Sequence, residues 1–414
     1  MQRVVRIHYK KTEELMKLSK RPFLDLALDF SFAFWFVAEN IFLHSIVAVF
    51  ALVLFMGLTI VKFVSLGVIK LKIPAIFVLY GIFVLVCYMN IWLGYSIKES
   101  LSLELGTTLI RNFAFLVLAY FYVTITDIER LKKIFVFATT AGSIFAMFMT
   151  LLTTGSFMLR GDDSIFNANT LAISAAVAIC FIVCSKEKWA TPYNIFCITV
   201  LSLLCIFSGT RKALIAAVIT IVVYFVLKNP QKLLKNTIFI LVFAVAVYFA
   251  LLKIPFLYEM LGNRVESMFA LLMGESGDKS AESRADFIKL GLEHFPNSPW
   301  LGHGINCFQT LRGAFDTYSH CNYIELLFSV GILGTLAYYS MYLFVLLYAL
   351  GKYFKNRSDN VVLSIGVIIS LFFIDFALVS YYERTNLILV IICLALITGE
   401  KKHAQKSLKT NRKS

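Results

Sequence analysis

Three short stretches carry residue types that could act together on a substrate that contains phosphate. They are SGTRK at 208–212, SRADF at 283–287 and SHCNY at 319–323. The first two contribute Arg211 and Arg284, whose planar guanidinium groups suit bidentate binding of phosphate. The third contributes His320, whose imidazole can accept a proton near neutral pH. Two arginines and one histidine would suit a diphosphate leaving group and a general base.

Weaker candidates lie nearby in the sequence. Gly302 and Gly304, in PWLGHG, allow a tight turn that brings the backbone close to another surface. Asn322 follows His320 by two residues and could either cap a helix or contact a substrate. Arg160, in LRGDD, lies on another loop, where the two aspartates after it could simply neutralise it.

Patterns typical of other enzyme classes are missing. His320 has no carboxylate or cysteine beside it at the spacing of metal ligands, and no DxD-like pair suggests a divalent cation for phosphate. A P-loop, a dinucleotide fingerprint and a serine-nucleophile elbow are also absent. We therefore expect no metal and no other cofactor. The eight cysteines include no CxxC pair, and only Cys307 and Cys321 lie where a disulfide could form if their loop is extracytoplasmic.

The composition is that of a membrane protein. Of the 414 residues, 59% are hydrophobic and only 15% are charged, more apolar surface than a soluble domain of this size could bury. The formal net charge of +14 fits the positive-inside bias and contact with anionic headgroups. We therefore expect membrane lipids as partners and no nucleic acid.

Runs of about 20 apolar residues predict an all-α polytopic membrane protein with about 12 transmembrane helices. With the N-terminus in the cytoplasm, most of the 39 Lys and Arg residues fall on cytoplasmic segments, so both termini are expected inside. The first span is the least regular, because Asp25 and Asp29 lie one helical turn apart on one face. The expected spans are 23–43, 45–64, 73–95, 105–126, 133–153, 165–184, 194–208, 212–227, 237–254, 321–350, 360–380 and 385–398.

This topology divides the chain into four regions. Helices 1–9 occupy residues 1–254, a large extracytoplasmic loop covers 255–320, helices 10–12 occupy 321–398, and a basic cytoplasmic tail, expected to be disordered, covers 399–414. Within the loop, AESRADFIKLGLEHF has the spacing of an amphipathic helix that lies along the membrane. Long loops in compact proteins are usually functional.

The depth of Arg211 gives it particular weight. It lies between two expected spans of about 15 residues, which at roughly 1.5 Å per residue fall short of the roughly 30 Å hydrocarbon core. A charge held below the surface costs on the order of 3 kcal/mol or more, so it requires a partner. An internal ion pair and an anionic substrate both meet that need. Arg284 taken alone would be an ordinary surface charge, but beside Arg211 it becomes a second clamp.

The order of these motifs resembles the O-antigen ligase and polymerase (Wzy/WaaL-type) superfamily. The resemblance covers roughly 205–345 and rests on SGTRKALIAA, SRADFIKLGLEHFPNSPWLGHGINCF and SHCNYIELLFSVGILGTLAYY. In IFNANTLA, Asn167 and Asn169 resemble a polar pair often seen there in the family, although they could also cap a helix.

The resemblance implies a GT-C-like, metal-independent, inverting glycosyltransferase of the bacterial plasma membrane. Its active site would be extracytoplasmic and its donor an undecaprenyl-diphosphate-linked glycan. His320 would be the general base, Arg211 and Arg284 would hold the diphosphate, and Asn322 would orient the loop or a sugar hydroxyl. A chain-length regulator and a flippase are the expected partners.

Several functions stay open. We favour a polymerase that joins lipid-linked repeat units into O-antigen or capsule, with a ligase that transfers the glycan to lipid A–core as the first alternative. A lipid-linked oligosaccharide flippase would instead predict mid-membrane charges and an inverted repeat. A peptidoglycan polymerase of the shape-and-division family would need a loop carboxylate, for which only Glu282 and Asp286 are nearby. In a purely structural alternative, the outer polar residues only hold helices together.

Overall fold

The computed structural model describes residues 22–42, 45–67, 73–159, 168–185, 190–228, 230–232 and 279–410, and short pieces between 238 and 266. These residues form helices and connecting loops, and none of them lies in a strand. The α-helices are α2 (Pro22–Ile41), α3 (Ile46–Ser65), α4 (Ala75–Trp92), α5 (Glu99–Ile125), α6 (Ile128–Thr154), α7 (Ala168–Val183), α8 (Pro192–Phe207), α9 (Arg211–Lys228), α13 (Lys279–His294), α14 (Asn322–Tyr353), α15 (Asp359–Ile374) and α16 (Arg384–Thr410).

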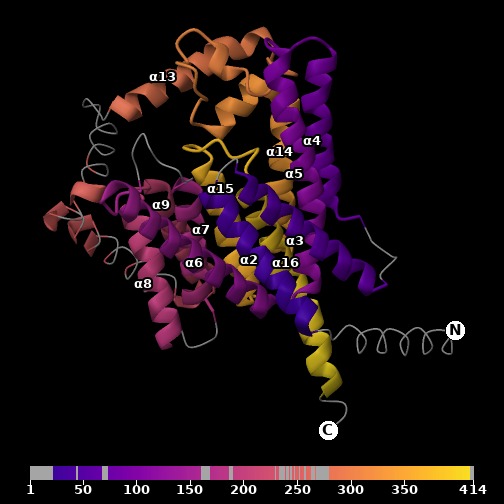
Figure 1. Ribbon diagram of the computed structural model, residues 1–414, viewed down its shortest axis with the longest axis vertical. Helices are drawn as coiled ribbons and strands as arrows, with labels where there is room; N and C mark the ends of the chain where they lie inside the picture. The colour runs from indigo at the N-terminus through magenta and orange to yellow at the C-terminus, as the bar shows by residue number, and fades with distance from the viewer. Residues whose placement is uncertain are drawn as a thin grey trace.

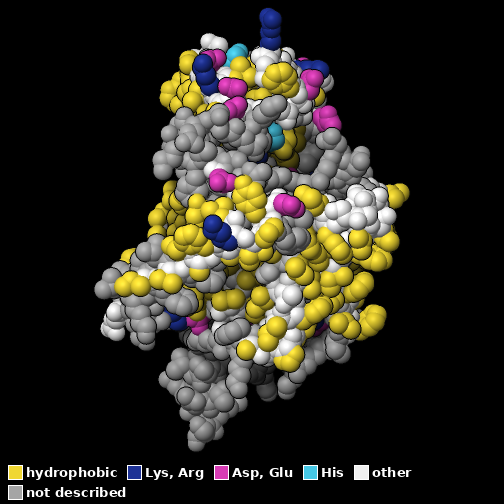
Figure 2. Space-filling view, turned by 90° about the vertical axis from the view of Figure 1, so that its left-hand side faces the viewer, with side chains coloured by type: hydrophobic (Ala, Val, Ile, Leu, Met, Phe, Trp, Pro, Cys, Tyr) yellow, Lys and Arg dark blue, Asp and Glu magenta, His cyan; other side chains and the backbone are white. Residues whose placement is uncertain are grey.

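The helices form an upright bundle that is capped at one end. Figure 1 shows α13 and its neighbouring turns at the upper end, while α16 runs out at the lower end. In Figure 2, hydrophobic side chains dominate the middle of the visible face and charged side chains gather above them. Among the described residues, five helices are long and apolar enough to cross a membrane, namely α3, α4, α5, α6 and α14. The protein is therefore an all-α membrane protein.

The described helices coincide with most of the expected spans. An α-helix occupies each expected range except 237–254, most of which lies outside the described residues. The count of twelve crossings stays a prediction, as does the full extent of the outer loop, because much of 255–278 also lies outside the described part. One expectation is wrong: α16 continues through Thr410, so residues 401–410 of the tail are helical rather than disordered.

The first helix, α2, is packed inside the bundle despite its two aspartates. Asp25 forms an ion pair with Lys62 of α3 at 2.6 Å, and Asp29 pairs with Arg130 of α6. One face of α2 buries large aromatic side chains, including Trp35, against the neighbouring helices. The aspartates thus have local counter-charges, which removes the main objection to α2 as a transmembrane helix.

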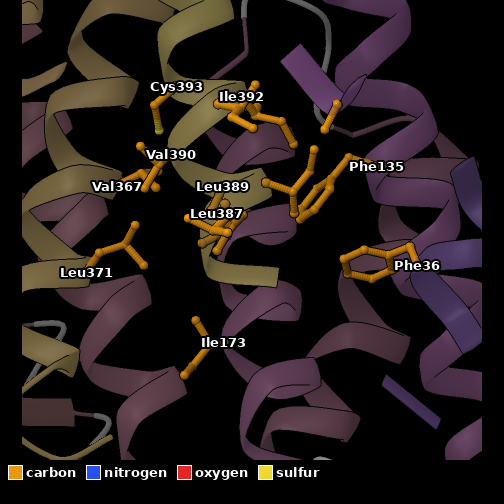
Figure 3. Close-up of a cluster of buried hydrophobic side chains, with 14 of the residues drawn as sticks. Phe36, Phe135, Ile173, Val367, Leu371, Leu387, Leu389, Val390, Ile392 and Cys393 are labelled. Carbon is orange, nitrogen blue, oxygen red and sulfur yellow. The ribbon is translucent and has the colours of Figure 1, made fainter. Parts of the chain in front are cut away.

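The core is centred on the apolar part of α16. Figure 3 shows its side chains facing α15 on one side and α2, α6 and α7 on the other. Residues 387–397 of α16 are buried without interruption. A helix that is apolar all round belongs in the interior of such a bundle, where every face finds a partner. Labelled members of this cluster are Phe36, Phe135, Ile173, Val367, Leu371, Leu387, Leu389, Val390, Ile392 and Cys393.

Helix length sets the shape of the upper end. α7, α8 and α15 have 16 residues each, which makes each about 24 Å long at 1.5 Å per residue. Figure 1 shows α4 and α5 rising to the level of α13, whereas α7, α9 and α15 end lower. The upper ends of the shorter helices therefore lie beneath α13.

Candidate active site

His320 lies in the loop just before α14, between two aromatic rings. The ring of Phe287, from α13, stacks on the imidazole with centroids 5.9 Å apart, and the ring of Tyr318 lies at 4.4 Å. The backbone of His320 has a φ of 57°, in the left-handed region that is uncommon for residues other than glycine. Such a conformation costs energy and is often held at functional sites.

The helix above this site is fixed by an apolar cluster. Phe287 packs with Phe308, Ile324 and Phe328, which anchors α13 to the first turns of α14. Arg284 lies three residues before Phe287, so both side chains project from the same face of α13. Packing of the phenylalanine thereby directs the arginine toward His320.

Burial, together with nearby positive charges, lowers the pKa of His320. Burial of the ring, and then the positive charges of Arg284 and Lys212, lower its pKa from 6.5 to about 4. At neutral pH the ring therefore has one nitrogen free of hydrogen, which can accept a proton. The electrostatic effect also shows that α9 and α13, far apart in sequence, bring cations to the same place.

The SGTRK stretch forms the turn between α8 and α9. Arg211 is the first residue of α9 and is partly buried, while Lys212 is only 8% exposed. The hydroxyl of Thr210 donates to Oδ1 of Asn169 on α7 at 3.2 Å. Asn169 therefore lies beside this turn, as its proposed binding role requires. Arg160 and Asn167 lie outside the described residues.

Gly302 and Gly304 bring the outer loop into contact with a break in α14. At Gly331, φ is 63° and ψ is −165°, which interrupts the helix. A Cβ on Gly302 would lie 2.4 Å from the backbone of Ser329, and one on Gly304 would lie 2.5 Å from Oγ of Ser96. Both glycines are therefore required for close packing. The bonds across the break run from His303 N to Phe328 O, Gly304 N to Ser329 O, Ile332 N to Pro299 O and Leu333 N to Trp300 O.

Asn322 is fully buried and fixes the start of α14 to the α15–α16 loop. Its Nδ2 donates to Asp375 Oδ2 at 3.2 Å and to the Tyr339 hydroxyl at 3.0 Å. Its Oδ1 accepts from the backbone N–H groups of Ser380 and Tyr381 at 2.9 and 3.2 Å. With the whole amide engaged, the geometry supports a role in orienting the loop and leaves no group for a sugar.

Two further expectations concern sulfur and metal. Cys307 and Cys321 are buried in the same apolar cluster beneath α13, and both are free thiols. Among the described residues, no three His, Cys, Asp or Glu side chains gather where they could hold a metal ion. Glu282 and Asp286 are exposed on α13, unlike the buried Phe287 beside them.

Sequence reasoning missed two residues at this site. Lys212 is adjacent to the chosen Arg211, but only the fold shows that it is the more buried of the two. Asp375 is fully buried and accepts hydrogen bonds from Asn322 and from the side chains of Tyr339 and Ser380. Its single sequence signal is an acidic residue at the end of an otherwise apolar span.

Comparison with known families identifies this part of the chain. A protein-family model described as O-antigen ligase matches residues 195–339. This match agrees with the resemblance to the O-antigen ligase/polymerase superfamily that the sequence motifs show. The matched segment runs from α8 to beyond the break in α14, and so contains Arg211, Lys212, Arg284 and His320. A search of curated proteins finds no match to the chain. The superfamily segment is therefore also the segment that builds the cationic site around His320.

Proposed function

We propose that this protein is a membrane glycosyltransferase that transfers a glycan from a polyprenyl-diphosphate carrier, and that it polymerises undecaprenyl-diphosphate-linked repeat units into O-antigen or capsule. The observation that carries the proposal is the position of His320 just before α14, where its ring contacts Phe287, one helical turn after Arg284 on α13, and where Lys212 of α9 is near enough for its charge to act on the ring. The neutral ring supplies a base, and the cations supply charge that a departing diphosphate needs.

The reaction would proceed by direct displacement. The acceptor hydroxyl oxygen attacks the anomeric carbon of the donor glycan from the face opposite the diphosphate. The bond from that carbon to the phosphate oxygen breaks, and its electron pair leaves with the diphosphate. The proton of the hydroxyl passes to His320. One displacement of this kind inverts the anomeric centre.

Cationic side chains would take the role that a divalent ion has in many phosphate-releasing enzymes. Arg284 would contribute from α13 and Arg211 from the first turn of α9, so the diphosphate would lie between these two helices. The reaction would then take place at the end of the bundle where α13 lies, opposite the lower end of α16 (Figure 1). The positive-inside rule assigns that end to the outer face of the bacterial plasma membrane.

A ligase is the second candidate, because the matched family is described as O-antigen ligase. A ligase would use the same donor and the same groups at the anomeric centre, and only its acceptor would differ. Lipid A–core would then replace the second lipid-linked repeat unit. A chain-length regulator and a flippase would be partners of the polymerase.

The proposal is tested with purified protein, an undecaprenyl-diphosphate-linked repeat unit and EDTA. The key variant is His320→Asn, because asparagine tolerates the left-handed backbone of this position while it removes the base. Lys98→Ala is the control, since Lys98 is exposed on the α4–α5 loop. A ladder of longer glycans from wild type and Lys98→Ala, reduced about 100-fold or more in His320→Asn, supports the polymerase.

Other outcomes decide against it. No ladder, but transfer once lipid A–core is supplied, would favour the ligase. Equal turnover by wild type and His320→Asn would remove the base from the mechanism. No transfer to either acceptor would reject the glycosyltransferase.

A further inference from the structure

Lys212 is a buried lysine that has no counter-charge among the residues that the structure describes. It is 8% exposed, and within the described part of the chain no carboxylate pairs with it and no acceptor bonds to its Nζ. The other two buried lysines differ: Lys62 pairs with Asp25 at 2.6 Å and Lys132 with Glu129 at 2.7 Å. Burial of an unpaired charge is expensive, and proteins normally avoid it.

The surroundings of Lys212 make this cost larger. It is the second residue of α9, so it lies at the positive end of the helix dipole, where a cation is disfavoured. Arg211 directly precedes it, and Arg284 is close enough for the two positive charges to repel each other. The charge of Lys212 also helps to lower the pKa of His320, so the two side chains lie near each other.

A ligand with negative charge would remove every one of these penalties at once. It would neutralise Lys212 and Arg284, and it could accept hydrogen bonds from N–H groups in the first turn of α9, as anions do at helix N-termini. We propose that Lys212, together with Arg284, binds the diphosphate of the lipid-linked donor directly, next to His320. This inference rests on the proposed function and extends it by naming the central ligand of the leaving group.

The different burial of Arg211 and Lys212 indicates different roles for the two side chains. Arg211 is partly buried, whereas Lys212 is 8% exposed and would have the diphosphate as its counter-charge. A lysine suits that position because its compact ammonium group can approach a phosphate oxygen where a planar guanidinium needs more room. Loss of its charge should therefore weaken diphosphate binding while it relieves strain in the empty protein.

The test measures binding and stability in the same variants. Lys212→Met removes the charge with little change in length, and Lys212→Arg keeps the charge. Lys132→Met is the matched control, because Lys132 is 7% exposed but has Glu129 and Asn360 as partners near the start of α6. The probes are undecaprenyl diphosphate and undecaprenyl monophosphate in detergent, with Kd from calorimetry and Tm from intrinsic fluorescence.

We expect Lys212→Met to weaken diphosphate binding at least tenfold and to leave Tm equal or higher. We expect it to reduce the preference for diphosphate over monophosphate, and Lys212→Arg to bind more tightly than Lys212→Met. Lys132→Met should lower Tm and leave Kd unchanged. These opposite signs separate a ligand-binding lysine from a structural one.

Two results would overturn the inference while leaving the proposed function intact. One is a Kd for Lys212→Met within twofold of wild type. The other is a lower Tm with an unchanged ratio of diphosphate to monophosphate affinity. If wild type itself binds undecaprenyl diphosphate no better than undecaprenol, the proposed donor is wrong and the inference fails with it.

Discussion

The buried carboxylate of Asp375 offers a stringent test of how the site is held. It accepts hydrogen bonds from Ser380 Oγ at 2.6 Å, the Tyr339 hydroxyl at 3.0 Å and Asn322 Nδ2 at 3.2 Å, and it is 0% exposed. In Asp375→Ala all three donors lose this acceptor. An unsatisfied buried donor costs about 1–3 kcal/mol. If one donor finds another partner and two stay unsatisfied at about 2 kcal/mol each, the free energy of unfolding falls by about 4 kcal/mol.

The expected changes in stability and turnover are separable. With about 2 °C of Tm per kcal/mol for a large chain, Asp375→Ala should lower Tm by about 8 °C. Asn322 follows His320 by two residues, so loosening it should displace the base. A misplacement of about 1 Å can cost about 100-fold in rate. We therefore expect kcat to fall tenfold or more, with little change in Kd for undecaprenyl diphosphate, whose cations come from α9 and α13.

The assay pairs fluorescence-detected unfolding in detergent with turnover of the lipid-linked repeat unit. Asp375→Asn keeps one acceptor oxygen, so its losses should be smaller than those of Asp375→Ala. Glu104→Ala, at an exposed position in α5, is the control and should change neither quantity. Unchanged Tm together with kcat within twofold of wild type in Asp375→Ala would refute the claim that this carboxylate positions the start of α14.

Three further predictions concern packing, pH and helix contacts. Gly302→Ala places a Cβ 2.4 Å from backbone atoms of α14, at a φ of 72° that alanine disfavours. The free energy of unfolding should therefore fall by roughly 3 kcal/mol or more, measured as a lower Tm. A variant with the Tm of wild type would contradict this. His320 acts in its unprotonated form, and its pKa is about 4. The value of kcat/KM for the donor should therefore begin to fall only below pH 5, which gives the acid limb of the pH profile. Lys212→Met removes a cation that opposes protonation and should move that limb to higher pH, whereas an unmoved limb would argue against the electrostatic contact. Glu39→Gln breaks the 2.8 Å ion pair between α2 and Arg384 of α16, in which both partners are largely buried. It should lower Tm by several degrees. Adding Arg384→Gln to this variant should lower Tm little further if loss of the ion pair is the cause.

Sequence reasoning located most of the helices because apolar runs of membrane length are a strong signal. From the short spans around Arg211 it also predicted a recessed charge, and the fold makes Arg211 the first, partly buried residue of α9. It could not choose the inward-facing member of the pair Arg211 and Lys212. Adjacent residues on a helix point about 100° apart, and α9 offers little polar contrast between its faces from which the buried side could be read. The position of Lys212 depends on α7 and α15, which pack against α9.

Contacts between segments far apart in the chain were the second feature that the sequence did not predict. Asn322 could be a helix cap or a sugar ligand on sequence grounds, and only the fold brings Asp375, 53 residues later, against its amide. The sequence likewise predicted that Gly302 and Gly304 would approach another surface, but it did not indicate that this surface is a break in α14 at Gly331. Such pairings depend on tertiary packing, which short motifs do not encode.

The break in α14 also constrains the order in which the protein can be made. Residues 299–304 leave the ribosome before Gly331, yet four of the backbone bonds that hold them come from the region of that break. The early hairpin of α4 and α5 offers them only a partial partner, chiefly through Asn90, which donates to Leu301 O and Gly302 O. A nascent chain that stops at residue 330 therefore contains Lys212, Arg284 and His320 but has no assembled site. The proposed site can therefore be completed only after α14 has been inserted, and the hydrogen bonds of Asn322 to Asp375 and Ser380 require the later helices α15 and α16 as well.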